Sequence, residues 1–155
     1  EFYNYMVEIG GEVRSKGVNE KGEIWKIGIE DPIVAMDERK LLAIVHLKDM
    51  SMATSGNYRS YYQLGDRTIA HTIDPRTGYN THHTLLSASV FAEDCMTADA
   101  YATAFMVLGV EGSKEILNNS NLEGFLIYHA ENGSLKSFVS EGIEPLLEFN
   151  KLDSN

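Results

Sequence analysis

The chain has 155 residues, about the length of one domain, and 43% of them are hydrophobic, which is enough to build a core. Lys and Arg number 13 against 23 Asp and Glu, and the net charge of −10 argues against a nucleic-acid surface or a basic membrane patch. No apolar run approaches the roughly 18 residues of a membrane span. The first residues also lack the basic-then-apolar order of a signal peptide, so the sequence predicts a soluble globular chain.

Short runs rich in β-branched and aromatic residues, separated by Gly, Asn and Asp, occur along most of the chain and are typical of antiparallel strands. Residues 65–66 (GD) and 131–133 (ENG) have the composition of hairpin tips. We expect strands at residues 5–9, 12–15, 24–30, 41–47, 56–63, 68–73, 85–92, 125–129 and 135–139.

The helices are expected late in the chain. Residues 97–108 (TADAYATAFMVL) are Ala-rich with long apolar side chains and stop at Gly109, and residues 112–119 predict a second helix. Strands followed by helices predict an α+β fold in which helices pack on one face of an antiparallel sheet.

Asp99 and Thr103 are four residues apart on the first expected helix, so they lie one turn apart on one face. A carboxylate and a hydroxyl at that spacing suit Mg²⁺ or Ca²⁺, which take oxygen ligands. Two explanations need no metal. The helix dipole favours an Asp in the first turn, and a Thr hydroxyl can bond back to a carbonyl of its own helix.

Residues 71–80 read HTIDPRTGYN and have the composition of a reverse turn, since Asp74 can bond to the backbone two residues on and Gly78 tolerates a positive φ. The turn alone does not explain why His71 and Thr72 lead into it. Both side chains could meet a phosphate or a carbonyl group.

Three weaker signals have structural alternatives. Gly10 and Gly11, in VEIGGEVR, would let a backbone approach a phosphate or a flat ring, but paired glycines equally make a β-bulge. Ser55, in ATSGNYRSYY, offers a hydroxyl beside a turn into a strand. His82 and His83 are adjacent, so on an extended chain they point to opposite faces, and we expect a partly exposed pair rather than a metal site.

In chain order the segments VEIGGEVR, WKIGIEDP, ATSGNYRSYY, HTIDPRTGYN and DCMTADAYATAFMVLG extend from about residue 5 to about residue 110. This succession resembles the ApbE family, the FAD:protein FMN transferases. The HxIDPxTG and TADAxxTA motifs are the most specific to that family, and both are complete in this sequence.

The resemblance implies a Mg²⁺-dependent enzyme that binds FAD and transfers its FMN half to a threonine hydroxyl of a target flavoprotein, releasing AMP. It also implies site residues. Asp99 and Thr103 match the family's metal ligands, and His71 matches the histidine that lines the flavin nucleotide site. His71 and Asp99 are both candidates to take the proton from the acceptor threonine.

The remaining residues carried over from the family are contacts to the cofactor. Thr72 and Ile73 are the strand neighbours of the motif histidine. Gly10 and Gly11 form a flat floor near FAD, and Ser55 lies in a motif expected to bind it.

Members of the family are longer than this chain and carry an upstream half that supplies further FAD contacts and one more metal ligand. We therefore expect residues 1–155 to be the C-terminal portion of a single ApbE-like domain, and to be inactive or nearly so without the other half. The family also implies a periplasmic or other extracytoplasmic location, with any lipid anchor in the absent half. The alternative functions are an FAD-binding protein and an FAD pyrophosphatase, neither of which transfers FMN to a protein.

Overall fold

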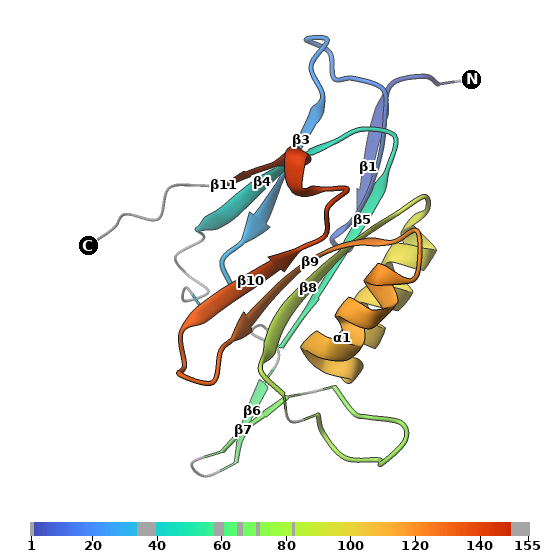
Figure 1. Cartoon of the computed structure of the whole chain (residues 1–155). Coiled ribbons are helices and arrows are strands. Elements are labelled where there is room, and N and C mark those ends of the chain that lie inside the picture. Colours follow the sequence, from blue (N-terminus) through green and yellow to red (C-terminus); the bar gives the residue numbers. More distant parts are fainter. Residues whose placement is uncertain are drawn as a thin grey trace.

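The computed structural model describes residues 2–33, 40–57, 61–64, 67–70, 72–81 and 83–149. Its main element is an antiparallel sheet whose strands lie in the order β1-β2-β5-β8-β9-β10 (Figure 1). The strands of this main sheet are β1 (Tyr5–Ile9), β2 (Glu12–Lys16), β5 (Ser51–Gly56), β8 (Leu85–Ala92), β9 (Glu123–His129) and β10 (Leu135–Val139).

A second, three-stranded sheet has the order β11-β4-β3, and β6 and β7 form a separate two-stranded ribbon. A short 3-10 helix, η1, precedes β11, and one long helix, α1, follows β8. The bounds of these elements are β3 (Trp25–Glu30), β4 (Leu41–Leu47), β6 (Tyr61–Leu64), β7 (Arg67–Ala70), α1 (Cys95–Asn118), η1 (Glu144–Leu146) and β11 (Leu147–Phe149).

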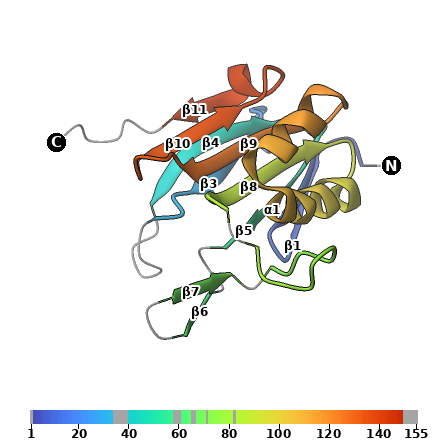
Figure 2. The same ribbon diagram turned by 60° about the horizontal axis from the view of Figure 1, so that its bottom comes forward.

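The main sheet is covered on both faces, by α1 on one and by the three-stranded sheet on the other (Figures 1 and 2). Side chains that alternate along β9 show this division. Leu126 belongs to the apolar cluster under α1, whereas Phe125 and Ile127 belong to the cluster shared with β3 and β4. Because both faces are buried, β8 reads as a nearly continuous run of small and apolar residues, LLSASVFA, instead of alternating with polar ones.

Helix α1 begins and bends for identifiable reasons. The Asp94 side chain caps it by accepting a hydrogen bond from the Thr97 amide, so the helix starts at Cys95, two residues before the expected position. At Gly109 the backbone leaves the helical region, with φ 73° and ψ −172°, and helix resumes after it. The predicted interruption at Gly109 is confirmed as a kink, but the helix resumes before residue 112, where a separate second helix was expected, and ends at Asn118.

The predicted α+β class is confirmed, and most expected strands are present. The single strand expected at residues 56–63 is wrong in its bounds, because β5 ends at Gly56 before Asn57 and β6 begins at Tyr61, while residues 58–60 lie outside the described residues. The strand expected at residues 68–73 ends at Ala70, and Ile73 forms only an isolated bridge with Asn80. β11 has no counterpart among the expected strands.

Both expected hairpins occur. Leu64 pairs with Arg67 across residues 65–66, which lie outside the described residues. Leu135 pairs with His129 across a tip in which Gly133 has φ 80°. Within the described part of the chain, no helix combines the length and the apolar character that crossing a membrane would require.

Candidate active site

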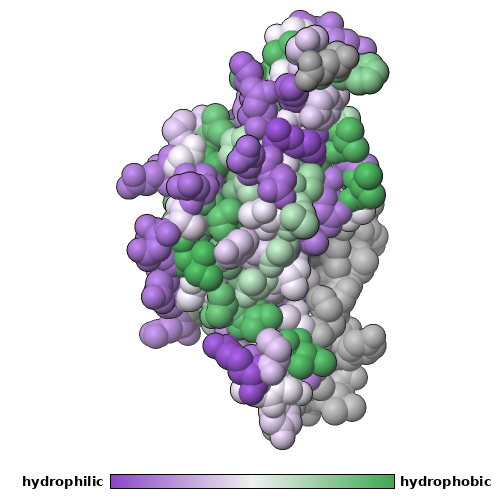
Figure 3. Space-filling view, turned by 90° about the vertical axis from the view of Figure 1, so that its right-hand side faces the viewer, coloured by the Kyte–Doolittle hydropathy of each residue, from purple (hydrophilic) through white to green (hydrophobic). Residues whose placement is uncertain are grey.

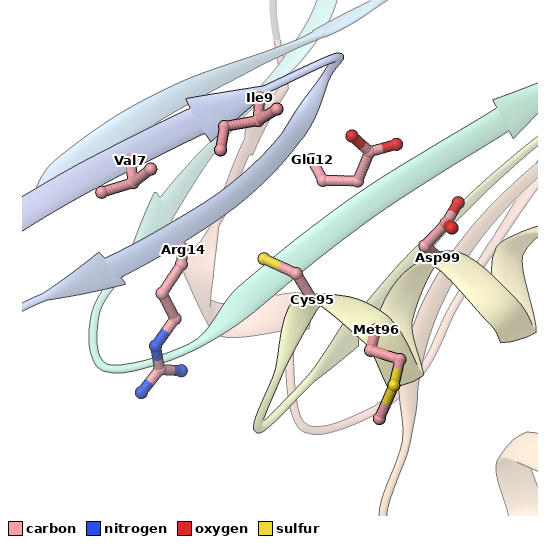
Figure 4. A pocket seen from close by; sticks show the side chains of 7 residues that line it. All are labelled: Val7, Ile9, Glu12, Arg14, Cys95, Met96 and Asp99. Carbon is pink, nitrogen blue, oxygen red and sulfur yellow. The ribbon is translucent and has the colours of Figure 1, made fainter.

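A pocket of about 300 Å³ lies where the β1–β2 hairpin meets the first turns of α1 (Figure 4). Gly10 and Gly11 form the tip of this hairpin, with φ 68° and 107°, and Ile9 pairs with Glu12 across them without a register shift. The glycines are thus a two-residue hairpin turn instead of the β-bulge considered from the sequence. The pocket is lined by Val7, Ile9, Glu12, Arg14, Cys95, Met96 and Asp99.

Arg14 ties β2 to the start of α1. Its Nη1 atom donates to the carbonyl oxygens of Glu93, at 2.6 Å, and Asp49, at 3.2 Å. Next in the chain, the Asp94 carboxylate accepts from the Thr97 amide at 2.8 Å and from the Thr97 hydroxyl at 2.9 Å. These hydrogen bonds from Thr97 hold the pKa of Asp94 below its ordinary value. The helix that carries Asp99 is therefore fixed at its amino end.

Asp99 is exposed, and among the described residues its carboxylate has no hydrogen-bond or ion-pair partner. Since the helix begins at Cys95, Asp99 lies beyond the first turn, where the stabilising effect of the helix dipole fades. Thr103 lies one turn further along, and its Oγ1 atom is 3.2 Å from the Oγ atom of Ser55. Neither structural explanation considered from the sequence therefore accounts for this pair.

The end of β5 joins α1 to the turn at residues 72–81. Ser55, near the end of this strand, contacts Thr103, and Asn57, just after the strand, accepts a hydrogen bond from the Thr72 hydroxyl at 3.2 Å. The Asn57 amide in turn donates to the carbonyl of Leu86 in β8 at 3.0 Å. Hydroxyls from three separate segments are thus held at one end of the main sheet.

Residues 72–81 fold back on themselves as the sequence predicts. The Asp74 amide donates to Tyr79 O at 2.9 Å, and the Gly78 amide donates to Asp74 O at 2.8 Å with φ 75° at Gly78. The Arg76 guanidinium binds the Asp74 carboxylate through Nε, at 2.9 Å, and Nη2, at 2.8 Å, and it holds the pKa of Asp74 below its ordinary value. Arg76 is therefore engaged within the turn.

The expected site residues divide into two groups around Asp99. Ser55 and Thr103 are in contact, and Thr72 is tied to the same strand end through Asn57. The turn at Gly10 and Gly11 lies instead beside the pocket that Asp99 lines, between two other lining residues.

For the other expected residues, the described part of the structure shows no hydrogen bond to the two groups around Asp99. Ile73 is 56% exposed and bridges to Asn80. His71 and His82 lie outside the described residues.

Sequence reasoning missed residues that hold the site together. Asn57 carries no local signal, because its partner Thr72 is fifteen positions away. Asp94 could have been found, since an Asp three residues before Thr97 at the start of an Ala-rich run is a common helix cap. His83, expected in a partly exposed pair, is half-buried and bonds to the backbone of α1.

Asp99 and Thr103 offer two oxygen atoms to a cation, and among the described residues no group of three or more His, Cys, Asp or Glu side chains comes together. Mg²⁺ commonly takes one or two carboxylates and completes its shell with waters and substrate phosphates. An exposed, unpaired carboxylate next to a hydroxyl fits that pattern. The described residues are thus suited to part of a magnesium shell.

Proteins of known name resemble this chain closely in sequence. A Haemophilus influenzae protein named FAD:protein FMN transferase is 45% identical over 130 residues, which are 84% of this chain and 37% of that protein. A Vibrio cholerae protein of the same name is 39% identical over 144 residues, which are 93% of this chain and 42% of that protein. The chain therefore spans less than half the length of these relatives.

Solved structures agree with the sequence matches. The flavin transferase ApbE from Vibrio cholerae matches with a TM-score of 0.77 and 37% identity, over 93% of this chain and 44% of that one. The apo form of the flavinyl transferase ApbE from Pseudomonas stutzeri matches with a TM-score of 0.74 and 33% identity, over 92% of this chain and 43% of that one. The model of the ApbE family matches residues 1–126. The chain belongs to the ApbE family.

Proposed function

We propose that this chain is the C-terminal portion of an enzyme that transfers FMN from FAD to a threonine of a target flavoprotein, with Mg²⁺ as cofactor and AMP as the second product. The observation that carries the proposal is the exposed Asp99 carboxylate, unpartnered among the described residues, one helical turn from the Thr103 hydroxyl. The names of the relatives support transfer of a flavin nucleotide to a protein.

The proposed reaction breaks the phosphoanhydride bond between the two halves of FAD and forms a phosphate ester with the acceptor threonine. The hydroxyl oxygen of the acceptor threonine attacks the phosphorus of the FMN half, and the bond from that phosphorus to the bridging oxygen breaks. AMP leaves with the bridging oxygen, and the hydroxyl proton passes to a base. His71 and Asp99 are the candidates for that base, because each is a titratable group expected near the phosphates.

Phosphoryl transfer of this kind depends mainly on positioning and on neutralising charge. Asp99 and Thr103 would hold the Mg²⁺, which would neutralise the pyrophosphate when bound. The fixed position of α1 supports this role, because Arg14 and the apolar contacts of Phe105 hold the helix against the main sheet, and Asp94 caps its first turn. A ligand pair on a fixed helix keeps its geometry without reorganising on binding.

The other expected contacts to FAD would lie on two sides of Asp99. The hairpin turn at Gly10 and Gly11 has no Cβ atom to keep a flat group away, and a Cβ built on Gly11 would meet nothing within 4 Å. On the other side, Ser55 and Thr72 offer hydroxyls near the end of β5. Ile73 would contribute apolar surface, since its side chain is exposed.

The deciding experiment uses a polypeptide that includes both this chain and the upstream half of the family domain. It is mixed with FAD, Mg²⁺ and an acceptor flavoprotein, and the acceptor is weighed by intact-mass spectrometry. Transfer adds the mass of FMN less water to the acceptor and releases AMP. An acceptor lacking the target threonine serves as the control and should gain no mass.

The alternative functions give different outcomes in the same assay. An FAD pyrophosphatase would release free FMN and AMP with or without acceptor. An FAD-binding protein would leave FAD intact and bound. Either result would contradict the proposed transfer of FMN and favour the corresponding alternative.

The proposal also includes an extracytoplasmic location, which rests on the family alone. Fractionation of the source cells, with detection by an antibody to residues 83–149, would test it. Recovery of the protein in the cytosolic fraction would contradict that location without affecting the proposed reaction.

A further inference from the structure

The interruption of α1 at Gly109 leaves helix ends in the middle of the element. Where a helix stops, the carbonyls of its last turn lose their partners four residues on. One of these carbonyls, that of Met106, receives a hydrogen bond from outside the helix, from the Nε2 atom of His83 at 2.7 Å. The His83 side chain therefore satisfies a carbonyl that the kink would leave without a partner.

The ring of His83 is held at both nitrogens. The Leu85 amide donates to Nδ1 at 3.2 Å, and an amide can only donate, so Nδ1 accepts. Met106 O can only accept, so the proton of the neutral ring is on Nε2. These two bonds define one tautomer and one orientation of the ring.

The same ring fills the space at the kink. A Cβ atom built on Gly109 would lie 3.3 Å from the Cγ and Cδ2 atoms of His83, which is closer than nearly all such contacts. Beyond the kink, the Ser113 hydroxyl donates to Gly109 O at 2.6 Å, so the second half of α1 has its own partner there. His83 thus acts on the half of α1 that precedes Gly109.

That half carries Asp99 and Thr103, with Met106 three positions further on. His83 itself follows the turn at residues 72–81 and leads directly into β8. One imidazole therefore connects the exit of the turn, the start of a central strand and the end of the helix segment that bears the two oxygen ligands.

We propose that His83 is a positioning residue for the Asp99–Thr103 pair, fixing the end of their helix segment through its hydrogen bond to Met106 O. Asp94 and Arg14 fix the other end of that segment. The inference rests on the proposed function for its effect on magnesium, but the effect on the helix itself is independent of it.

Two substitutions separate the two hydrogen bonds. His83→Asn keeps an acceptor that can take the amide two residues on, as in an Asx turn, but is too short to reach Met106 O. His83→Gln places an amide donor at about the reach of Nε2 and keeps the bond to Met106 O. Both remove the ring and each keeps a different one of the two hydrogen bonds, so a difference between them shows which bond fixes the helix.

The test measures amide hydrogen exchange along α1 and magnesium affinity in the polypeptide with the complete family domain. We expect H83N to speed exchange at residues 99–107, and to weaken Mg²⁺ binding, each by about fivefold, as for the loss of one hydrogen bond. H83Q should stay near the unsubstituted protein in both, and residues 111–118 should change in neither variant.

Equal behaviour of H83N and H83Q, or an effect of H83N that is uniform over all of α1, would overturn the proposal. Failure of both variants to fold would also overturn it, because it would assign His83 a purely structural role. If the unsubstituted protein neither binds Mg²⁺ nor transfers FMN, the proposed function fails instead, and the exchange contrast at residues 99–107 still decides the role of His83.

Discussion

At the residue scale, the environment of Asp99 separates function from stability. Its carboxylate is exposed and unpartnered within the described structure, so its removal deletes no hydrogen bond there and opens no cavity. We expect Asp99→Ala to change the free energy of unfolding by less than about 0.5 kcal/mol, as for other surface substitutions. Magnesium-dependent transfer should fall by at least tenfold, because a charged ligand is lost.

The measurement pairs urea unfolding with the acceptor mass assay in the polypeptide that has the complete domain. Glu115 provides the matched control, since it is an exposed acid on α1 beyond the kink. Glu115→Ala should leave transfer unchanged. Full Mg²⁺-dependent activity in Asp99→Ala would show that Asp99 is not a ligand.

At the same scale, the sequence predicted some contacts of the candidate site and not others. The pairing of Asp99 with Thr103 follows from helical spacing, so it could be read directly. The contact of Thr103 with Ser55 spans 48 positions, and that of Thr72 with Asn57 depends on where β5 ends. No local pattern encodes such contacts, because they follow from the pairing of strands distant in sequence.

At the element scale, the cap of α1 makes the stability of the protein depend on pH. Hydrogen bonds from Thr97 lower the pKa of Asp94 in the folded state. A lowered pKa stabilises the fold at pH values above the unfolded value, about 3.9, and this contribution is lost as the pH falls through the folded value. Unfolding by urea at pH 7 and at pH 3 measures it.

Two variants separate charge from capping at this position. Asp94→Asn keeps a good cap but cannot titrate, so we expect its stability to depend less on pH than that of the unsubstituted protein. Asp94→Ala should be less stable than Asp94→Asn at pH 7, where both are uncharged at this position. An unchanged pH dependence in Asp94→Asn would assign the acid sensitivity to other groups, with Asp74 the first candidate because its pKa is also lowered.

The kink of α1 gives a second prediction at this scale. Gly109 has φ 73° and ψ −172°, a region that residues with a Cβ atom avoid at a cost of about 1–3 kcal/mol. We expect Gly109→Ala to destabilise the protein by about that amount, with added crowding against His83. Gly133 has a similar φ of 80°, and a Cβ built on it would meet nothing within 4 Å, so Gly133→Ala shows the backbone cost without crowding, and thermal unfolding compares the two.

Elements were predicted well where the residue types strongly favour helix or strand, and poorly where they favour neither. The apolar run of β8 and the Ala-rich start of α1 are clear in sequence. β5 reads SMATSG, with small residues and a single β-branched one, and it is a strand because β2 and β8 pair with it on either side. The aromatic residues after it drew the predicted strand toward positions 56–63.

At the scale of the whole molecule, the α+β class followed from the order of the elements, but the layers did not. The sequence placed helices on one face of a sheet, and the other face is covered by β3, β4 and β11. Burial on that side depends on contacts such as Phe125 with Phe149, whose ring centroids are 5.8 Å apart although the residues come from different sheets. No local sequence pattern predicts such contacts, because they join residues of different sheets.

The molecule also exposes apolar side chains beside its candidate site. Ile9 on β1 is 74% exposed and Met96 at the start of α1 is 80% exposed, and both line the pocket with Asp99. Figure 3 views the side of the molecule on which α1 lies and shows apolar surface between hydrophilic side chains. We propose that the upstream half of the family domain covers this surface.

This proposal predicts that residues 1–155 alone transfer little or no FMN, because one wall of the FAD site would be missing. The acceptor mass assay compares this chain with the polypeptide that carries the complete domain. Adding the upstream half as a separate polypeptide should restore transfer in part. Full activity of residues 1–155 alone would contradict the need for that half.

The Asp99 carboxylate, which has no partner in the part of the chain that the structure describes, bears on the order in which ligands would bind. FAD presents an anionic pyrophosphate, and at the proposed site a chain with a net charge of −10 and an exposed carboxylate would repel it. Without a divalent cation, raising the ionic strength should strengthen FAD binding by screening that repulsion, the opposite of what a basic phosphate site would do. At the proposed site, metal and dinucleotide would then bind together or the metal first, and FAD without a cation would bind weakly.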